Sequence, residues 1–305
     1  MPREHFASDH AFLPRAELLS FEEIARFAGV VAELGVHKLR LTGGEPLLRA
    51  KLSHLVRLLS DLPGVDLALT TNGSLLARDA QALADAGLRR VTVSLDALSP
   101  EVFRRMADAD YDVSDVLAGI EAASRAGLGP IKINTVVRRG INEGEVSNLA
   151  RHFRGSGHIL RFIEYMDVGI TNGWQLGQVV SGQELVERLT RELPLEPLPA
   201  NYEGEVARRF RYRDGSGELG VITSVTQPFC GNCTRLRLSS DGKLYTCLFG
   251  RSFHDVRALL RAGTSESQLR EFVAALWQAR TDRYSEERSE RTRSLPRIEM
   301  SYIGG

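Results

Sequence analysis

The first half of this 305-residue chain alternates short runs of strand-forming residues with amphipathic stretches. This alternation predicts a parallel sheet with helical crossovers, either a barrel or a doubly wound sheet. Ser20 and Glu23 match the capping box of a helix start, and Gly35 follows the expected end of that helix. The expected strands span residues 38–42, 66–71, 90–95, 131–137 and 159–165.

The pattern changes after residue 166, where a glycine-containing loop begins. The proline-rich stretch 194–210 predicts a connector, and Ser240-Asp241-Gly242 predicts a hairpin turn because Asp-Gly tolerates positive φ. We therefore divide the chain into a partial barrel, 1–166, and a C-terminal region, 167–305. In this region we expect strands at 220–225, 234–240 and 243–249, and helices within 254–263 and 265–280.

Composition excludes a general attraction to polyanions. Acidic and basic residues balance at 39 each, so neither nucleic acid nor a membrane surface is an expected partner. No apolar run approaches the roughly 20 residues that cross a bilayer, and the first residues lack a signal-like apolar core. The default expectation is a cytoplasmic protein.

The three cysteines, Cys230, Cys233 and Cys247, lie in one short segment. An odd number of clustered cysteines argues against a disulfide framework and for a metal or cluster site. The spacing leaves three alternatives open: a zinc site completed by a ligand such as His254, a 4Fe-4S cluster with one iron lacking a cysteine, or inert thiols. Only the cluster leaves an open iron position that a substrate nitrogen or oxygen can occupy.

Basic residues recur at every second position of some expected strands, so that they point to the same face. Arg235 and Arg237 alternate after Cys233, and Lys38 and Arg40 alternate on the first expected strand. Cations inside strands are costly unless they line a wet, anionic site. For any one of these residues alone, an ordinary exposed side chain is the favoured interpretation. If these pairs face one cavity, that cavity suits a polyphosphate.

Polar residues follow four of the expected strands, as GGEP, TNG, DA and MD. The C-terminal ends of strands carry the active site in α/β barrels. Turn chemistry is the alternative explanation, because Gly, Asn and Asp are common turn formers.

The segments LRLTGGEPLLR, LTTNG, VSLDA, RFIEYMDVG, the cysteine segment and the terminal SYIGG together resemble the radical S-adenosylmethionine (SAM) GTP 3′,8-cyclase family of molybdenum cofactor biosynthesis. The resemblance covers the whole chain. GGEP alone indicates only a radical SAM enzyme, whereas C-x2-C-x13-C with a terminal Gly-Gly is more specific. The implied fold is α/β: an incomplete (βα)6 barrel, here without its first strand, and a C-terminal α+β region that closes its mouth.

The resemblance also implies a reaction and its partners. The family forms (8S)-3′,8-cyclo-7,8-dihydroguanosine 5′-triphosphate from GTP in a lyase-type reaction, through a 5′-deoxyadenosyl radical made from SAM at a 4Fe-4S cluster. The implied partners are GTP, a reductant and the next enzyme of the pathway, cyclic pyranopterin monophosphate synthase. A homodimer is left open.

Site residues follow by position from the same resemblance. Those implied to contact SAM are Gly44, Ser94 and Met166. Those implied to contact GTP are Lys38, Arg40, Thr70, Lys132, Arg161, Arg235, Leu236 and Arg237. Cys230, Cys233 and Cys247 are the implied ligands of a substrate-side 4Fe-4S cluster, and Gly304 and Gly305 resemble a tail that reaches into the active site.

One family motif is not found in these 305 residues: the C-x3-C-x2-C loop that binds the radical cluster. We expect the first strand, those three cysteines and an N-terminal arginine to be missing, and the start to be an internal methionine of a longer protein. As printed, the chain is expected to be inactive yet able to bind GTP and one cluster. The alternatives are a non-catalytic remnant, a zinc-bearing barrel hydrolase or lyase, and another radical SAM enzyme with auxiliary clusters.

Overall fold

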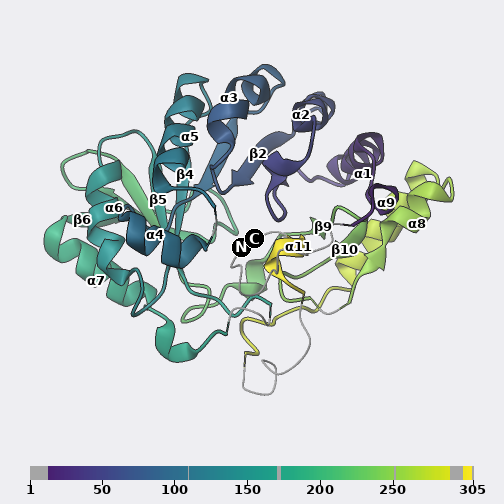
Figure 1. Cartoon of the computed structure of the whole chain (residues 1–305). Coiled ribbons are helices and arrows are strands. Elements are labelled where there is room, and N and C mark those ends of the chain that lie inside the picture. Colours follow the sequence, from purple (N-terminus) through teal and green to yellow (C-terminus); the bar gives the residue numbers. More distant parts are fainter. Residues whose placement is uncertain (1–12, 109, 170–172, 251, 289–297, 304–305) are drawn as a thin grey trace.

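A curved eight-stranded sheet forms the body of the molecule (Figure 1). The computed structural model describes residues 13–108, 110–169, 173–250, 252–288 and 298–303. The strand order is β1-β2-β3-β4-β5-β8-β7-β6. Strands β1 to β5 and β8 are parallel to one another, whereas β7 is antiparallel to β8 and to β6. The strands are β1 (Lys38–Leu41), β2 (Asp66–Thr71), β3 (Arg90–Ser94), β4 (Lys132–Val137), β5 (Ile159–Glu164), β6 (Leu195–Leu198), β7 (Ala207–Tyr212) and β8 (Glu218–Ile222).

The expected fold class is confirmed, because the parallel strands alternate with helices that cover the outer face of the sheet (Figure 1). The five strands predicted in the first half all form, with bounds within about one residue. Their apolar positions, such as Leu69, Val93 and Phe162, face a core shared with the helices. The helices of this part are α1 (Phe21–Glu33), α2 (Leu52–Ser60), α3 (Leu76–Asp85), α4 (Pro100–Ala107), α5 (Val113–Arg125), α6 (Val146–Phe153) and α7 (Gly182–Glu192).

The predicted connector at 194–210 is wrong. It contains β6 and the start of β7, which pair antiparallel and extend the sheet beyond β8. Pro197 is tolerated because β6 is an edge strand, where a missing N–H costs no ladder bond. The sheet therefore continues past the predicted domain boundary at 166/167, and that boundary stays a prediction.

A second, smaller sheet stands apart from the first, in the order β11-β10-β9. Its strands are β9 (Arg237–Leu238), β10 (Lys243–Tyr245) and β11 (His254–Asp255), and the C-terminal region also holds α8 (Val256–Arg261), α9 (Glu266–Gln278) and α11 (Met300–Ile303). The predicted turn forms between β9 and β10, where Gly242 has φ +83°. The strands on either side are much shorter than predicted.

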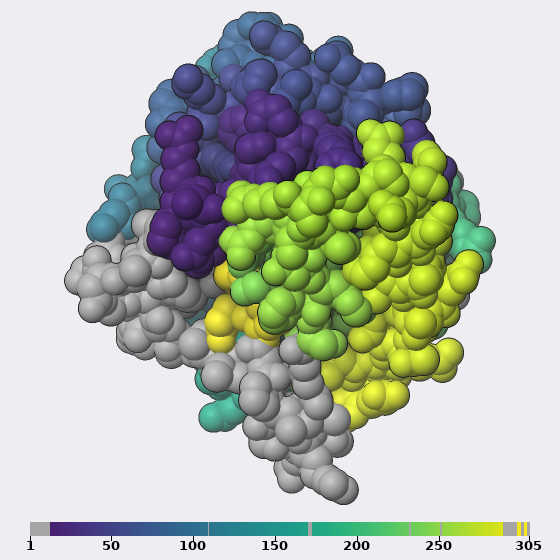
Figure 2. Space-filling model, turned by 90° about the vertical axis from the view of Figure 1, so that its right-hand side faces the viewer, coloured from purple at the N-terminus to yellow at the C-terminus, as the bar shows by residue number. Residues whose placement is uncertain are grey.

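The C-terminal region packs on the beginning of the chain. A separate apolar cluster joins Leu19, Phe27 and Val31 near α1 to Leu260 and Val273 of α8 and α9. Figure 2 shows this contact from the side, with the C-terminal helices lying against the N-terminal segment. The two halves of the sequence therefore share buried surface.

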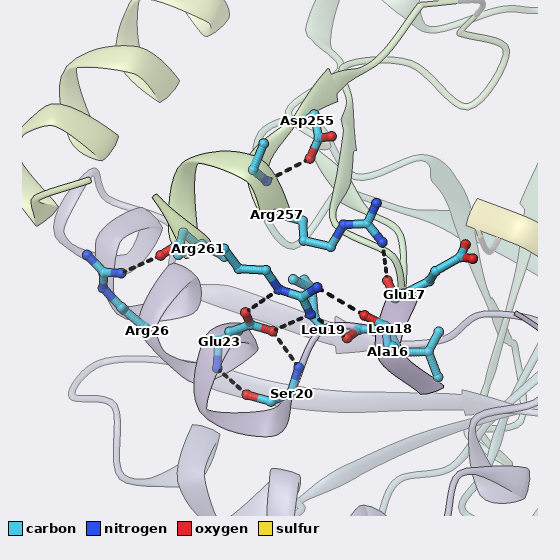
Figure 3. A network of polar contacts seen from close by, with 12 residues as sticks. Ala16, Glu17, Leu18, Leu19, Ser20, Glu23, Arg26, Asp255, Arg257 and Arg261 are labelled. Carbon is cyan, nitrogen blue, oxygen red and sulfur yellow. Dashed lines mark hydrogen bonds and ion pairs between the residues drawn. The ribbon is translucent and has the colours of Figure 1, made fainter. Parts of the chain in front are cut away.

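Polar contacts reinforce this junction (Figure 3). Arg261 of α8 donates hydrogen bonds to the carbonyls of Ala16 and Leu18 and to the carboxylate of Glu23. Glu23 also accepts from the backbone N–H of Ser20, whose hydroxyl accepts from Glu23, so the predicted capping box is confirmed. The start of α1 is thus held by α8 as well as by its own cap.

No helix of the described residues is both long and apolar enough to pass through a lipid bilayer.

Candidate active site

The concave face of the large sheet is lined with cations. Five basic side chains alternate along their strands with the apolar core residues and therefore point to the opposite face of the sheet. They are Lys38 and Arg40 of β1, Arg90 of β3, Lys132 of β4 and Arg161 of β5. Pairing in register brings these positions side by side across β1 to β5. Four of the five were predicted from the sequence, and Arg90 was not.

Hydrogen bonds between neighbouring strands fix the guanidinium groups. Arg40 Nη1 donates to Thr70 Oγ1 at 2.7 Å and to Thr92 Oγ1 at 3.2 Å. Arg161 Nε donates to Asn134 Oδ1 at 3.0 Å. These partners are neutral, so both guanidinium groups keep their full charge available to an anion.

The electrostatics of this face favour an anionic ligand. The pKa of Lys132 falls to about 8, first because the surrounding protein removes water and second because Arg161, Lys38 and Arg40 repel its charge. The same two causes lower the pKa of Arg161 to about 10 and lower that of Lys38. Crowded cations that disfavour their own charge gain stability when an anion binds among them.

A loop between β6 and β7, at the edge of the sheet opposite to β1, reaches this face. The Lys38 ammonium lies 5.5 Å from the ring centre of Tyr202, and Tyr202 and Glu205 both act electrostatically on Arg161. Tyr202 remains half exposed, at 51%. The loop thus partly covers the cationic face.

The predicted GGEP loop is tied to the end of the next strand by its glutamate. The Glu45 carboxylate accepts from Thr71 Oγ1 and the backbone N–H of Asn72, both at 2.7 Å, and from the N–H of Leu47 at 3.0 Å. Burial raises the pKa of Glu45 even though these bonds oppose the rise. Gly43 has φ +136°, which only glycine adopts readily, and the adjacent Gly44 is exposed.

Two further predicted SAM contacts lie at the same end of the sheet. Ser94 is exposed at the last position of β3, in register with Asn134. Met166 follows β5 and is half-buried. It packs against an apolar cluster that includes Phe229, and also against a cluster that includes Cys247.

The cysteine segment therefore meets the sheet at the C-terminal ends of its strands. Cys230 and Cys233 lie on one turn of 3-10 helix, and the charges of Cys233 and Cys247 influence each other. Burial raises the pKa of Cys247. For Cys233 burial also acts upward, but the charge and hydrogen bonds of Arg235 outweigh it, and the net pKa is lowered.

The zinc alternative with His254 is not supported by this arrangement. His254 is exposed on β11 and packs its ring edge-on against Phe272. Among the described residues, no three His, Cys, Asp or Glu side chains converge as ligands of a single metal ion. A 4Fe-4S cluster is larger than one ion, so cysteines that hold it stand further apart.

The two arginines of the cysteine segment face the thiols. Arg235 donates to Cys233 Sγ from Nε at 3.3 Å and from Nη2 at 3.2 Å. Burial and the neighbouring Arg235 lower the pKa of Arg237 to about 10. Leu236 packs its side chain the other way, into the apolar cluster around α1 and α9.

The structure thus brings the predicted strand cations together and places the thiols near the strand ends. Gly304 and Gly305 lie outside the described residues. The sequence analysis did not single out Asp66, Arg90, Thr92 and Asn134. Their alternation with apolar residues on the expected strands does indicate that they face away from the core. Arg280 was not singled out either. It donates a hydrogen bond to the carbonyl of Cys233, and no local pattern would have revealed that contact.

Comparisons with known proteins agree with this architecture. A model of the radical SAM superfamily matches residues 5–153, and a model described as Molybdenum Cofactor Synthesis C matches residues 158–286. A solved structure of SuiB from Streptococcus suis bound to its precursor peptide is similar in fold, with a TM-score of 0.50 and 15% identity over 61% of this chain and 41% of that one. The fold and the site define a radical SAM protein.

Full-length relatives narrow the class further. Three proteins named GTP 3′,8-cyclase match 100% of this chain. The one from Acidothermus cellulolyticus is 54% identical over 91% of its own length, and the one from Xanthomonas campestris is 49% identical over 89% of its length. The one from Staphylococcus haemolyticus is 44% identical over 91% of its length. The chain belongs to the GTP 3′,8-cyclase family.

Proposed function

We propose that this protein carries out the reaction for which its relatives are named, the 3′,8-cyclisation of GTP, as the first step of molybdenum cofactor biosynthesis. The reaction is of the lyase type. The observation that carries the proposal is the group of five cations on one concave face, whose strands end beside the turn that bears the cysteines. This arrangement suits a ligand with a phosphate chain at one end and a base at the other.

In this proposal the strand cations hold the triphosphate. Arg40 and Arg161 are already oriented by neutral partners on adjacent strands, so little side-chain freedom is lost on binding. Lys132 gains its full charge when a phosphate arrives. The loop with Tyr202 covers the outer side of the phosphates.

The cysteine turn fits a cluster bound by three thiolates. Cys230 and Cys233 share one turn, and Cys247 is close enough to Cys233 for their charges to interact. Arg235 and Arg237 balance the negative charge of the thiolates. When bound, a 4Fe-4S cluster supplies an iron without a cysteine, which can take an oxygen or nitrogen of the purine. Arg280, just after α9, ties the turn to the C-terminal region, and the contact with Met166 ties it to the sheet.

The SAM contacts are Gly44, Ser94 and Met166, at the C-terminal ends of β1, β3 and β5. Gly304 and Gly305 are proposed to enter the same site. The family's radical chemistry needs a second cluster, for which these 305 residues contain no further cysteine. The tasks assigned to this chain are therefore binding and orientation. The reductant, the next pathway enzyme and a homodimer remain predictions.

The decisive experiment compares this chain with a version extended at its N-terminus by a C-x3-C-x2-C segment from a full-length relative. Both proteins are purified and reconstituted without oxygen, and 5′-deoxyadenosine is measured with and without GTP and reductant. We expect GTP-dependent product from the extended version alone. Equal activity of the short chain would contradict our account of the second cluster.

The alternative functions are tested with the same protein preparations. Iron, sulfide and zinc are measured per chain, with Cys247→Ser as the control. One zinc per chain without iron would favour a zinc-bearing hydrolase or lyase. Binding of GTP by both versions, without 5′-deoxyadenosine from either, would favour a non-catalytic remnant.

A further inference from the structure

A single carboxylate interrupts the cationic face. Asp66 is the first residue of β2 and lies in register with Lys38 of β1. Its oxygens lie 4.0 Å from Lys38 Nζ and 3.2 Å from Arg90 Nε. On this face of β1 to β5, whose strands are all described, Asp66 is the only acidic residue within the strand bounds.

The position of this carboxylate in the fold is specific. Lys38, Asp66 and Arg90 are the first residues of three neighbouring parallel strands. Gly44, Met166 and the cysteine turn lie at the opposite ends of the strands. A ligand whose base lies beside the cysteines can reach Asp66 only with the far end of a phosphate chain.

The contacts of Asp66 oppose such a ligand in two ways. The carboxylate engages Lys38 and Arg90 in the empty protein, so a phosphate must compete for them. Its negative charge also repels the approaching terminal phosphate. Its side chain is 30% exposed, so water and salt weaken both effects without abolishing them.

We propose that Asp66 competes with the terminal phosphate of the bound nucleotide for Lys38 and Arg90, and so limits the affinity of the site for long phosphate chains. The proposal rests on the proposed function, in which the concave face takes the triphosphate of GTP. Asp66 is then a specificity-determining residue at the far end of the site. The opposing view is that Asp66 only holds the two cations in place.

The test is the binding of GTP, GMP and inorganic tripolyphosphate to Asp66→Asn, measured by calorimetry at low ionic strength. Asparagine keeps the shape and removes the charge. We expect about tenfold tighter binding of GTP and of tripolyphosphate, and less than a twofold change for GMP, which is too short to reach the residue. The gain for GTP should shrink as salt is added.

Asp61→Asn is the matched control, because Asp61 is exposed at the end of α2 and the substitution changes the net charge identically. It should leave all three affinities unchanged. Asp66→Glu keeps the charge and should bind GTP no more tightly than the wild type. Melting temperatures show that each variant is folded.

The outcomes separate the two proposals. If the wild type binds neither GTP nor tripolyphosphate, the proposed function fails and the role of Asp66 fails with it. If the wild type binds GTP but Asp66→Asn binds it equally or more weakly, the function stands and competition by Asp66 is refuted. An equal gain for GMP and GTP would also refute it, because the effect would then not depend on chain length.

Discussion

At the residue scale, the site depends on side chains that carry charge in a partly desolvated place. Lys132 is the clearest case, because both burial and three neighbouring cations oppose its protonation. Its electrostatic interactions with Arg161, Lys38 and Arg40 reach from β4 to β5 and β1. No single strand could produce this environment.

The lowered pKa of Lys132 predicts a pH dependence of anion binding. Below about pH 8 the lysine is charged in the empty protein, and affinity for tripolyphosphate should not vary through this group. Above about pH 8 it loses its proton, and binding must restore the charge, so affinity should fall by up to about tenfold per pH unit.

Calorimetry from pH 6.5 to 9.5 checks this, over a range that spans the value of about 8. Binding to Lys132→Met still varies with pH because tripolyphosphate itself titrates. The difference between the pH profiles of the two proteins therefore gives the contribution of Lys132. The assignment is wrong if the two pH profiles run parallel.

The same shift affects stability in a defined direction. The folded pKa lies below the ordinary value of 10.5, so the unfolded chain binds more protons between about pH 8 and 10.5. Lys132 therefore destabilises the fold below about pH 8, and that cost is relieved as the pH rises through this window.

At the element scale, short pieces of the C-terminal region are held by polar contacts with distant elements. α11 is only four residues long and cannot be stable alone. Tyr302 docks it on the β9–β10 hairpin, where its hydroxyl lies 2.5 Å from Asp241 Oδ2 and 3.1 Å from Lys243 Nζ. Ile303 beside it is buried.

Removing the Tyr302 hydroxyl should loosen this hairpin. Among the described residues, Tyr302→Phe leaves the nearly buried carboxylate of Asp241 with Lys243 and Ser239 as its side-chain partners. We expect a loss of about 1–2 kcal/mol in the free energy of unfolding. Amide hydrogen exchange should also become faster at residues 239–245. Urea denaturation and exchange measured by mass spectrometry provide the two readouts.

Tyr111→Phe serves as the control, because the Tyr111 hydroxyl makes no hydrogen bond to another described residue, while its ring packs on Phe103. It should cost less than Tyr302→Phe and leave the hairpin unaffected. Equal exchange rates in all three proteins would show that Tyr302 does not hold the hairpin.

At the scale of the whole molecule, the N-terminal helix and the C-terminal region share a core. Leu19, Phe27 and Val31 pack with Leu260 and Val273, and Arg261 bonds the backbone just before α1 (Figure 3). The large sheet also combines strands from both matched family regions. Neither half can unfold without exposing apolar surface of the other.

We therefore expect one cooperative thermal transition in scanning calorimetry, with the calorimetric and van't Hoff enthalpies equal. Val273→Ala, in the shared cluster, should lower that single midpoint rather than split the transition, because it removes buried methyl groups at the junction. Ala80→Gly, within the barrel core, should likewise shift the same transition. Two resolved transitions would contradict this view of the junction.

Much of this protein could be predicted from its sequence. The positions of the parallel strands, the capping box at Ser20 and the turn at Gly242 follow from local periodicity and backbone chemistry. Their alternation also predicts that Lys38 and Arg40 share one face of their strand, and both lie on the face opposite the core residues. These features depend on residues a few positions apart, where steric and capping preferences act directly.

The tertiary structure alone decided which distant groups meet. The pairing of Asp66 with Lys38 and Arg90, the cover provided by Tyr202 and the contact of Arg280 with the cysteine turn join residues far apart in the chain. The strands β6 and β7 form because a sheet edge was available to them, despite Pro197. Such contacts depend on strand register and sheet curvature. Both result from packing over the whole core, so no short sequence pattern predicts them.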